Sequence, residues 1–91
     1  MMKKIWKVTY EDFKPLLMPE DADIISIGKQ ANRLVLWFKT SGNSPEKITD
    51  RILIVPTGEE VNDDLKFYGT FVSDEGLAYH IFDKYKTRFH G

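Results

Sequence analysis

The sequence lacks cysteine and long apolar runs, and each absence excludes a class of protein. Small secreted domains usually need disulfides, so a chain of 91 residues without cysteine is expected in a reducing compartment. No run approaches the roughly 18 apolar residues of a membrane-spanning helix. The start, MMKKIWKVTY, has no apolar stretch long enough for a signal peptide. These features predict a cytosolic protein without a membrane partner.

An excess of either charge is also lacking, since 13 Lys and Arg face 14 Asp and Glu for a net charge of -1. Proteins that bind DNA or RNA in general depend on a strong basic excess, so no DNA partner is expected. A small anionic ligand remains compatible with this balance, because two or three well-placed cations suffice for one phosphate.

What the chain does contain is apolar and aromatic. Hydrophobic residues make up 42% and aromatic residues 13%, which is ample for a folded core. The length predicts a single domain over residues 1–91. With two Trp, four Tyr and six Phe in so short a chain, some aromatic side chains should lie at the surface or against a partner.

Short β-prone segments separated by turn residues predict the fold class. The expected strands are 3–10, 23–28, 33–40, 49–55, 68–73 and 77–85. Residues 30–32 should close one hairpin and Gly76 another. We expect at most one short helical turn, near residues 63–66, and a loose tail at 86–91. The prediction is an all-β fold, a small antiparallel sandwich or partly open barrel of about six strands.

Several strands are apolar on both faces. In the strongest strand Leu34, Leu36 and Phe38 share one face, while Val35 and Trp37 share the other. Either the chain covers both faces itself, or a homo-oligomer buries the second face. We favour the oligomer on the sequence alone.

Candidate binding residues lie mainly at strand ends. Arg51 could clamp a phosphate or carboxylate with its guanidinium fork, although a salt bridge to Asp50 is the more common role. Thr57 and Gly58 could cradle an anion, or form an ordinary turn. Tyr68 and Thr70 flank Gly69, and a glycine inside a strand marks either a bulge or the close approach of a ligand.

No catalytic or metal-binding pattern accompanies these residues. His80 has no nucleophile or carboxylate partner in the sequence pattern, so we expect a hydrogen-bonded core or interface histidine. His80 and His90 lack structural zinc spacing, and neither a metal nor a cofactor is expected. Trp6 stands beside Lys7, an arrangement that suits an anionic aromatic ligand, although core packing is the more frequent role of tryptophan.

Six segments occur in an order that resembles a known family. They are KKIWK, MPEDADIISI, LVLWF, RILIVPTG, YGTF and AYHIFD, and they cover residues 3–83. In this respect the chain is similar to a family of small phage proteins, formerly of unknown function, that includes an anti-CBASS sponge. That sponge binds the cyclic dinucleotide signal 3′,3′-cGAMP as a homotetramer and does not cleave it.

The resemblance implies a phage immune-evasion protein, acting in the cytoplasm of the infected bacterial host. It implies a phosphate contact from Arg51 or Lys7, polar contacts from Thr57 and Thr70, and base stacking on Trp6 or Tyr68. One departure concerns the family's Gly-Thr-Gly-His-Pro, where this chain has Pro56-Thr57-Gly58-Glu59-Glu60. A proline has no N–H to offer a phosphate. The alternatives are an inhibitor that binds a host defence protein directly and, least favoured, a phosphodiesterase that uses His80.

Overall fold

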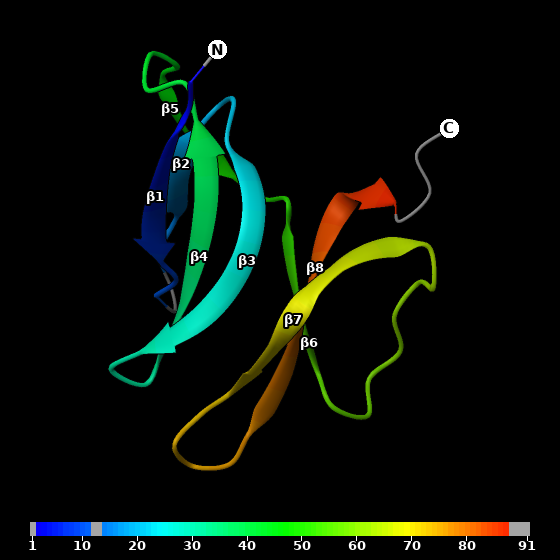
Figure 1. Ribbon diagram of the computed structural model, residues 1–91. Coiled ribbons are helices and arrows are strands. Elements are labelled where there is room, and N and C mark those ends of the chain that lie inside the picture. The colour runs from blue at the N-terminus through cyan, green and yellow to red at the C-terminus, as the bar shows by residue number, and fades with distance from the viewer. Residues whose placement is uncertain (1, 12–13, 88–91) are drawn as a thin grey trace. The chain divides into compact units, whose positions relative to one another are not determined.

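The fold is all-β, as the sequence predicted. The computed structural model describes residues 2–11 and 14–87, and these form eight strands and no helix (Figure 1). The strands are β1 (Lys4–Thr9), β2 (Leu16–Pro19), β3 (Asp23–Gln30), β4 (Arg33–Thr40), β5 (Glu46–Thr49), β6 (Ile52–Pro56), β7 (Leu65–Val72) and β8 (Ala78–Thr87). All pairings are antiparallel and make three small sheets, β1–β4–β3, β2–β5 and β6–β8–β7.

Three segments differ from the sequence-based expectation. Residues 16–19 form a strand rather than a connection. Pro19, which has no N–H, stands at the end of that strand, and the backbone N–H groups of the other three residues can donate hydrogen bonds. The expected strand 49–55 is divided, since β5 pairs with β2 whereas β6 pairs with β8. The helical turn expected at 63–66 is wrong, because β7 begins at Leu65.

The expectation of a loose tail is wrong for residues 86 and 87. β8 runs to Thr87, so residues 86 and 87 belong to a strand. The other residues of that tail, 88–91, lie outside the described part of the chain, as does His90.

The chain divides into two units, residues 1–49 and 50–91. In the first unit β4 is the central strand of its sheet, and the β3–β4 hairpin has a two-residue turn within the predicted 30–32. Ala31 and Asn32 form that turn with φ angles of 50° and 59°, as a type I′ turn requires. Leu36 and Val35, on opposite faces of β4, are both buried within a single chain.

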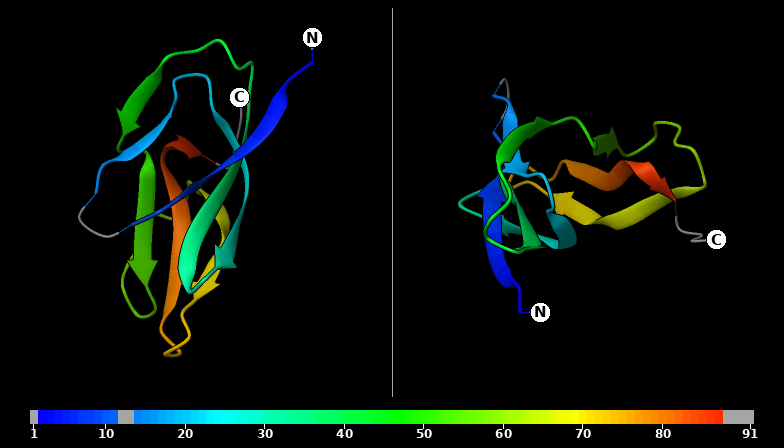
Figure 2. Two further views of the ribbon diagram at one scale, coloured as in Figure 1. Left: turned by 90° about the vertical axis from the view of Figure 1, so that its left-hand side faces the viewer. Right: turned by 90° about the horizontal axis from the view of Figure 1, so that it is seen from above.

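The second unit is the sheet in which β8 lies between β6 and β7 (Figures 1 and 2). Residues opposite one another on neighbouring strands share a face of the sheet. We call one face the histidine face. It carries two rows, the first Val55, His80 and Thr70 and the second Leu53, Phe82 and Phe67. The opposite, aspartate face carries Ile81 and Asp83, which are both fully buried.

A β-bulge in β7 sets which face each residue takes. The register shifts between Phe67 and Gly69, so Tyr68 is the extra residue. Gly69 has a φ of 151°, which a residue with a side chain rarely adopts. The sequence offered a bulge or a ligand approach at this glycine, and the bulge is confirmed.

Candidate functional site

Three residues predicted as ligand-binding meet on the histidine face. His80 Nε2 lies 2.9 Å from Thr57 Oγ1, and His80 Nδ1 lies 2.9 Å from Thr70 Oγ1. Thr57 follows the end of β6, His80 is on β8 and Thr70 is on β7, so the cluster spans all three strands. Both threonines are exposed and the imidazole is half-buried. We call this group the threonine–histidine cluster.

The hydrogen bonds assign the donors in the cluster. Thr57 Oγ1 also lies 3.4 Å from the Ala78 carbonyl oxygen, to which it can only donate. With its hydroxyl hydrogen directed there, Thr57 accepts from His80 Nε2–H, and Thr70 donates to His80 Nδ1. At 3.4 Å the bond to Ala78 is weak, so the Thr57 hydroxyl can turn its hydrogen toward an incoming anion at little cost.

Gly58 lies in the turn that presents Thr57. The Glu59 amide donates to the Pro56 carbonyl oxygen over 3.2 Å, and Gly58 has a φ of 98°. Thr57 and Gly58 are thus the central residues of a tight turn. The Thr57 amide donates to the Ala78 carbonyl oxygen, so this N–H is used inside the protein. The Thr57 hydroxyl, not its backbone amide, is the group that can meet a ligand here.

Arg51 and Tyr68 converge on Asp83, which the sequence did not single out. The Arg51 guanidinium donates to Asp83 Oδ2 at 3.2 Å through Nε and 3.0 Å through Nη2, and the Tyr68 hydroxyl donates to the same oxygen at 2.7 Å. The other carboxylate oxygen accepts from the amides of Tyr85 and Lys86, each at 2.9 Å. The Asp83 side chain is 1% exposed and that of Arg51 is 18% exposed.

This network gives Arg51 a structural role. The salt bridge expected for Arg51 is present with Asp83, while Asp50 accepts a hydrogen bond from the Tyr85 hydroxyl. Burial disfavours the ionised carboxylate of Asp83, but the bonds from Tyr68, the Tyr85 amide and Arg51 outweigh it, so the pKa of Asp83 is lowered. Burial and the bond to Asp83 raise the pKa of Tyr68. An ionised Asp83 thus holds the guanidinium that the sequence offered to a phosphate.

Trp6 and Lys7 lie on β1, in the first unit. As neighbours in a strand they point to opposite faces, so they do not form one plate-and-cation site. Trp6 is 56% exposed. The Lys7 ammonium donates to Gln30 Oε1 and lies 5.7 Å from the centre of the Trp37 ring. The aromatic partner of Lys7 is therefore Trp37.

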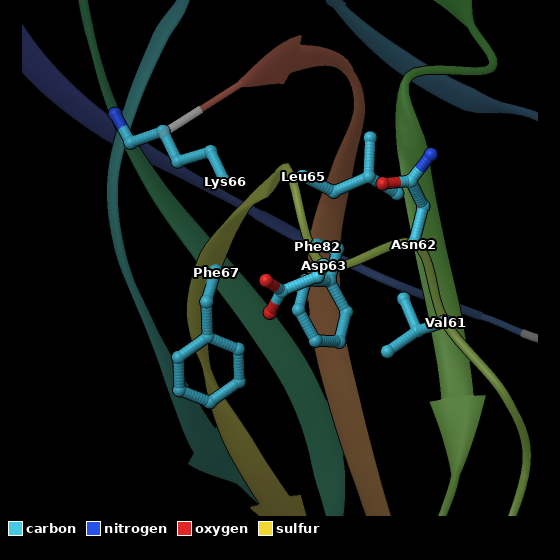
Figure 3. Close-up of a pocket in the computed structure, with 7 residues that line it drawn as sticks. All are labelled: Val61, Asn62, Asp63, Leu65, Lys66, Phe67 and Phe82. Carbon is cyan, nitrogen blue, oxygen red and sulfur yellow. The ribbon is translucent and has the colours of Figure 1, made fainter. Parts of the chain in front are cut away.

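A pocket of about 450 Å³ lies beside the second row of the histidine face (Figure 3). It is lined by residues 61–63 and 65–67 and by Phe82. The Phe67 and Phe82 rings, 5.1 Å apart between centres and tilted by 49°, form its aromatic wall. Sequence reasoning missed these two residues, although Phe67 directly precedes Tyr68 and Phe82 follows His80 by two residues. Their pairing depends on the β7–β8 register, which the bulge displaces by one residue.

The described residues hold neither a metal-binding cluster nor a membrane-spanning helix. Residues 2–11 and 14–87 contain no group of three or more His, Asp or Glu side chains placed to hold a metal ion. No helix in that part of the chain is long and apolar enough to cross a membrane.

Comparison with known proteins gives a family and no function. No curated protein matches the chain, and no solved structure matches it. Residues 1–90 match a family described as a domain of unknown function, DUF7352. Because the match covers nearly the whole sequence, the chain belongs to the DUF7352 family.

Proposed function

We propose that this protein binds a cyclic dinucleotide, 3′,3′-cGAMP, and sequesters it without cleaving it. The observation that carries the proposal is the threonine–histidine cluster beside the Phe67–Phe82 pair on one face of the β6–β8–β7 sheet. Polar donors next to aromatic rings suit a ligand that joins a phosphate to a purine.

The cluster would hold the phosphate. The hydroxyls of Thr57 and Thr70 are exposed, and both can donate to a phosphate oxygen after turning their hydrogens outward. The imidazole of His80 lies 2.9 Å from each hydroxyl oxygen and so holds the two threonines in place on either side of it. Arg51 is left out of this site because Asp83 holds its guanidinium.

The phenylalanine pair would hold the base. Phe82 follows His80 by two residues on the same face of β8, which places the two side chains about 7 Å apart along the strand. That spacing suits a nucleotide lying along the strand, with its phosphate at His80 and its purine at Phe82. Stacking of a base on an aromatic side chain contributes about 1–3 kcal/mol.

Sequestration in an infected host is the role that the resemblance to the phage sponge supports. Capture alone silences a signal, so the site needs no group that attacks the phosphodiester. We propose further that the protein works as a homotetramer, as that resemblance implies, because a cyclic dinucleotide with two phosphates suits a site shared by two copies. The exposed Phe67 and Val72, at 53% and 48%, leave the histidine face apolar enough to meet a second copy.

The test is calorimetric titration with 3′,3′-cGAMP, followed by heating of the complex and chromatography of the released nucleotide. The proposal predicts saturable binding and recovery of intact ligand. Recovery of cleaved nucleotide would show that the protein is an enzyme and not a sponge. No heat from a protein shown to be folded would contradict the proposal.

A second candidate rests on the same exposed side chains. Phe67, Val72 and Leu77 are each about half exposed, and such residues often mark a protein interface. An inhibitor that binds a host defence protein would be recovered with that partner from host lysate and would carry no nucleotide. Replacement of Phe67 by serine would then abolish the capture.

A further inference from the structure

We infer that the pocket beside Phe67 and Phe82 selects guanine over adenine through the carboxylate of Asp63. This inference rests on the proposed function, because it names the base that the proposed dinucleotide site prefers. It is carried by a pocket that combines an aromatic wall with an acidic side chain.

The pocket has the size and lining for one base. Its volume of about 450 Å³ falls within the range of about 300–1,000 Å³ that is usual for small-molecule pockets. The two phenyl rings supply an apolar surface for stacking, and Val61 and Leu65 extend the apolar lining. Such walls favour any purine, so they provide affinity without choosing between bases.

Asp63 supplies the polar group that can distinguish guanine from adenine. Its side chain lines the same pocket as the rings of Phe67 and Phe82 (Figure 3). The turn that presents it is fixed on both sides. Asn62 Oδ1 accepts from the Asp64 amide over 2.9 Å, and the Asn62 carbonyl oxygen accepts from the Leu65 amide over 3.3 Å.

The chemistry of the two purines decides the preference. On its pairing edge guanine presents two adjacent donors, N1–H and the N2 amino group, which match the two oxygens of a carboxylate. Adenine presents one amino donor beside the N1 acceptor, and that acceptor would face a carboxylate oxygen without a hydrogen between them. A carboxylate at this position therefore attracts guanine and disfavours adenine.

The loop's charge supports an acidic contact with the base rather than with the phosphate. Glu59, Glu60 and Asp64 accompany Asp63 in the same exposed loop. An anion would be repelled by this loop, whereas the donor edge of guanine would not. The ligand is thus oriented with its base toward the loop and its phosphate toward the threonine–histidine cluster.

The experiment compares cyclic di-GMP, 3′,3′-cGAMP and cyclic di-AMP by calorimetry on the intact protein, its Asp63→Asn variant and its Asp64→Asn variant. Asp64 is the matched control, because it belongs to the same turn but does not line the pocket. We expect the unmodified protein to bind the guanine-containing ligands at least tenfold more tightly than cyclic di-AMP, which is about 1.4 kcal/mol. Asp63→Asn should reduce that preference at least fivefold, and Asp64→Asn should leave it unchanged.

The outcomes separate the two proposals. Equal affinity for all three ligands would overturn the guanine inference but would not contradict the proposed sequestration of a cyclic dinucleotide. An unchanged preference in Asp63→Asn would overturn the role of Asp63. No binding of any of the three by protein that melts normally would overturn the proposed function and this inference with it.

Discussion

The Tyr68 hydroxyl donates to Asp83 Oδ2 over 2.7 Å, and this bond depends on the bulge that Gly69 permits. Without the extra residue in β7, the alternation of the strand would place Tyr68 on the other face of the sheet. The bulge therefore directs one aromatic side chain to the buried carboxylate and leaves Phe67 on the histidine face.

Removal of that hydroxyl should destabilise the protein. Tyr68→Phe deletes a bond to a buried ionised carboxylate, and hydrogen bonds to charged groups contribute about 1.5–3 kcal/mol. We expect a loss of about 2 kcal/mol in the free energy of unfolding, measured by urea denaturation. Tyr85→Phe is the control, since its hydroxyl makes a 2.7 Å bond to the exposed Asp50. Equal losses in the two variants would show that the buried bond to Asp83 contributes no more to stability than the exposed bond to Asp50.

Asp83→Asn should have a larger effect. The change removes the negative charge from a side chain that is 1% exposed and leaves Arg51 without its charged partner. Breaking one side of a buried ion pair costs about 3–5 kcal/mol. The variant should unfold at much lower urea concentration, whereas Glu60→Gln in the exposed loop should not change the midpoint. A midpoint near that of the unmodified protein would contradict the account of Arg51 as a structural residue.

Asp21 should make stability depend on pH in the acid range. Thr40 Oγ1 donates to its carboxylate over 2.6 Å and the Ser41 amide over 2.9 Å, and these bonds lower the pKa of Asp21 to about 2. An unfolded aspartate titrates near 3.9, so below about pH 4 the unfolded chain takes up a proton that the folded chain does not. The stabilisation from Asp21 is therefore complete above pH 4 and is lost as the pH falls through about 2.

The comparison of Asp21→Asn with the unmodified protein tests the direction of this pH dependence. The variant should be less stable at pH 7, and the difference should narrow as the pH falls from 4 toward 2. Glu20→Gln, which removes an exposed ion pair with Lys47, serves as the control. A difference that is constant from pH 7 to 2 would contradict the lowered pKa.

The β3–β4 turn offers a stabilising substitution. Ala31 has a φ of 50°, and a left-handed conformation costs a residue with a side chain about 1–2 kcal/mol. Ala31→Gly removes that cost, although glycine adds about 0.5–1 kcal/mol of entropy to the unfolded chain. We expect a net gain of about 0.5 kcal/mol by thermal denaturation. Ala78→Gly, in the regular strand β8, should lower stability instead, and a loss in both variants would contradict the strain at Ala31.

The sequence predicted those parts of the fold that depend on short segments. A continuous run of β-prone apolar residues identified β4, and the 30–32 turn joined it to β3, because such signals lie within about ten residues. The division of residues 49–55 was not predictable, because Thr49 and Ile52 are both β-prone and could belong to one strand. Only the separate partners β2 and β8 make the chain change sheets there.

The candidate site was predictable as a set of residues but not as an arrangement. Thr57 and His80 are 23 residues apart and Arg51 and Asp83 are 32 apart, so only the strand register brings each pair together. Nothing in the sequence favours Asp83 over Asp50 as the partner of Arg51. Thr70 was chosen because it follows Gly69, whereas in the structure its hydroxyl is hydrogen-bonded to His80.

The central claim is that the threonine–histidine cluster binds the phosphate of the dinucleotide. The most direct measurement is the dissociation constant for 3′,3′-cGAMP of a variant that combines Thr57→Val with Thr70→Val, beside Thr9→Val as a matched control on β1. Valine has nearly the shape of threonine, and Thr57 and Thr70 are both exposed, so the fold should persist. The account predicts affinity at least tenfold weaker in the double variant, about 1.4 kcal/mol, and unchanged in the control. Equal affinity in all three proteins would contradict it.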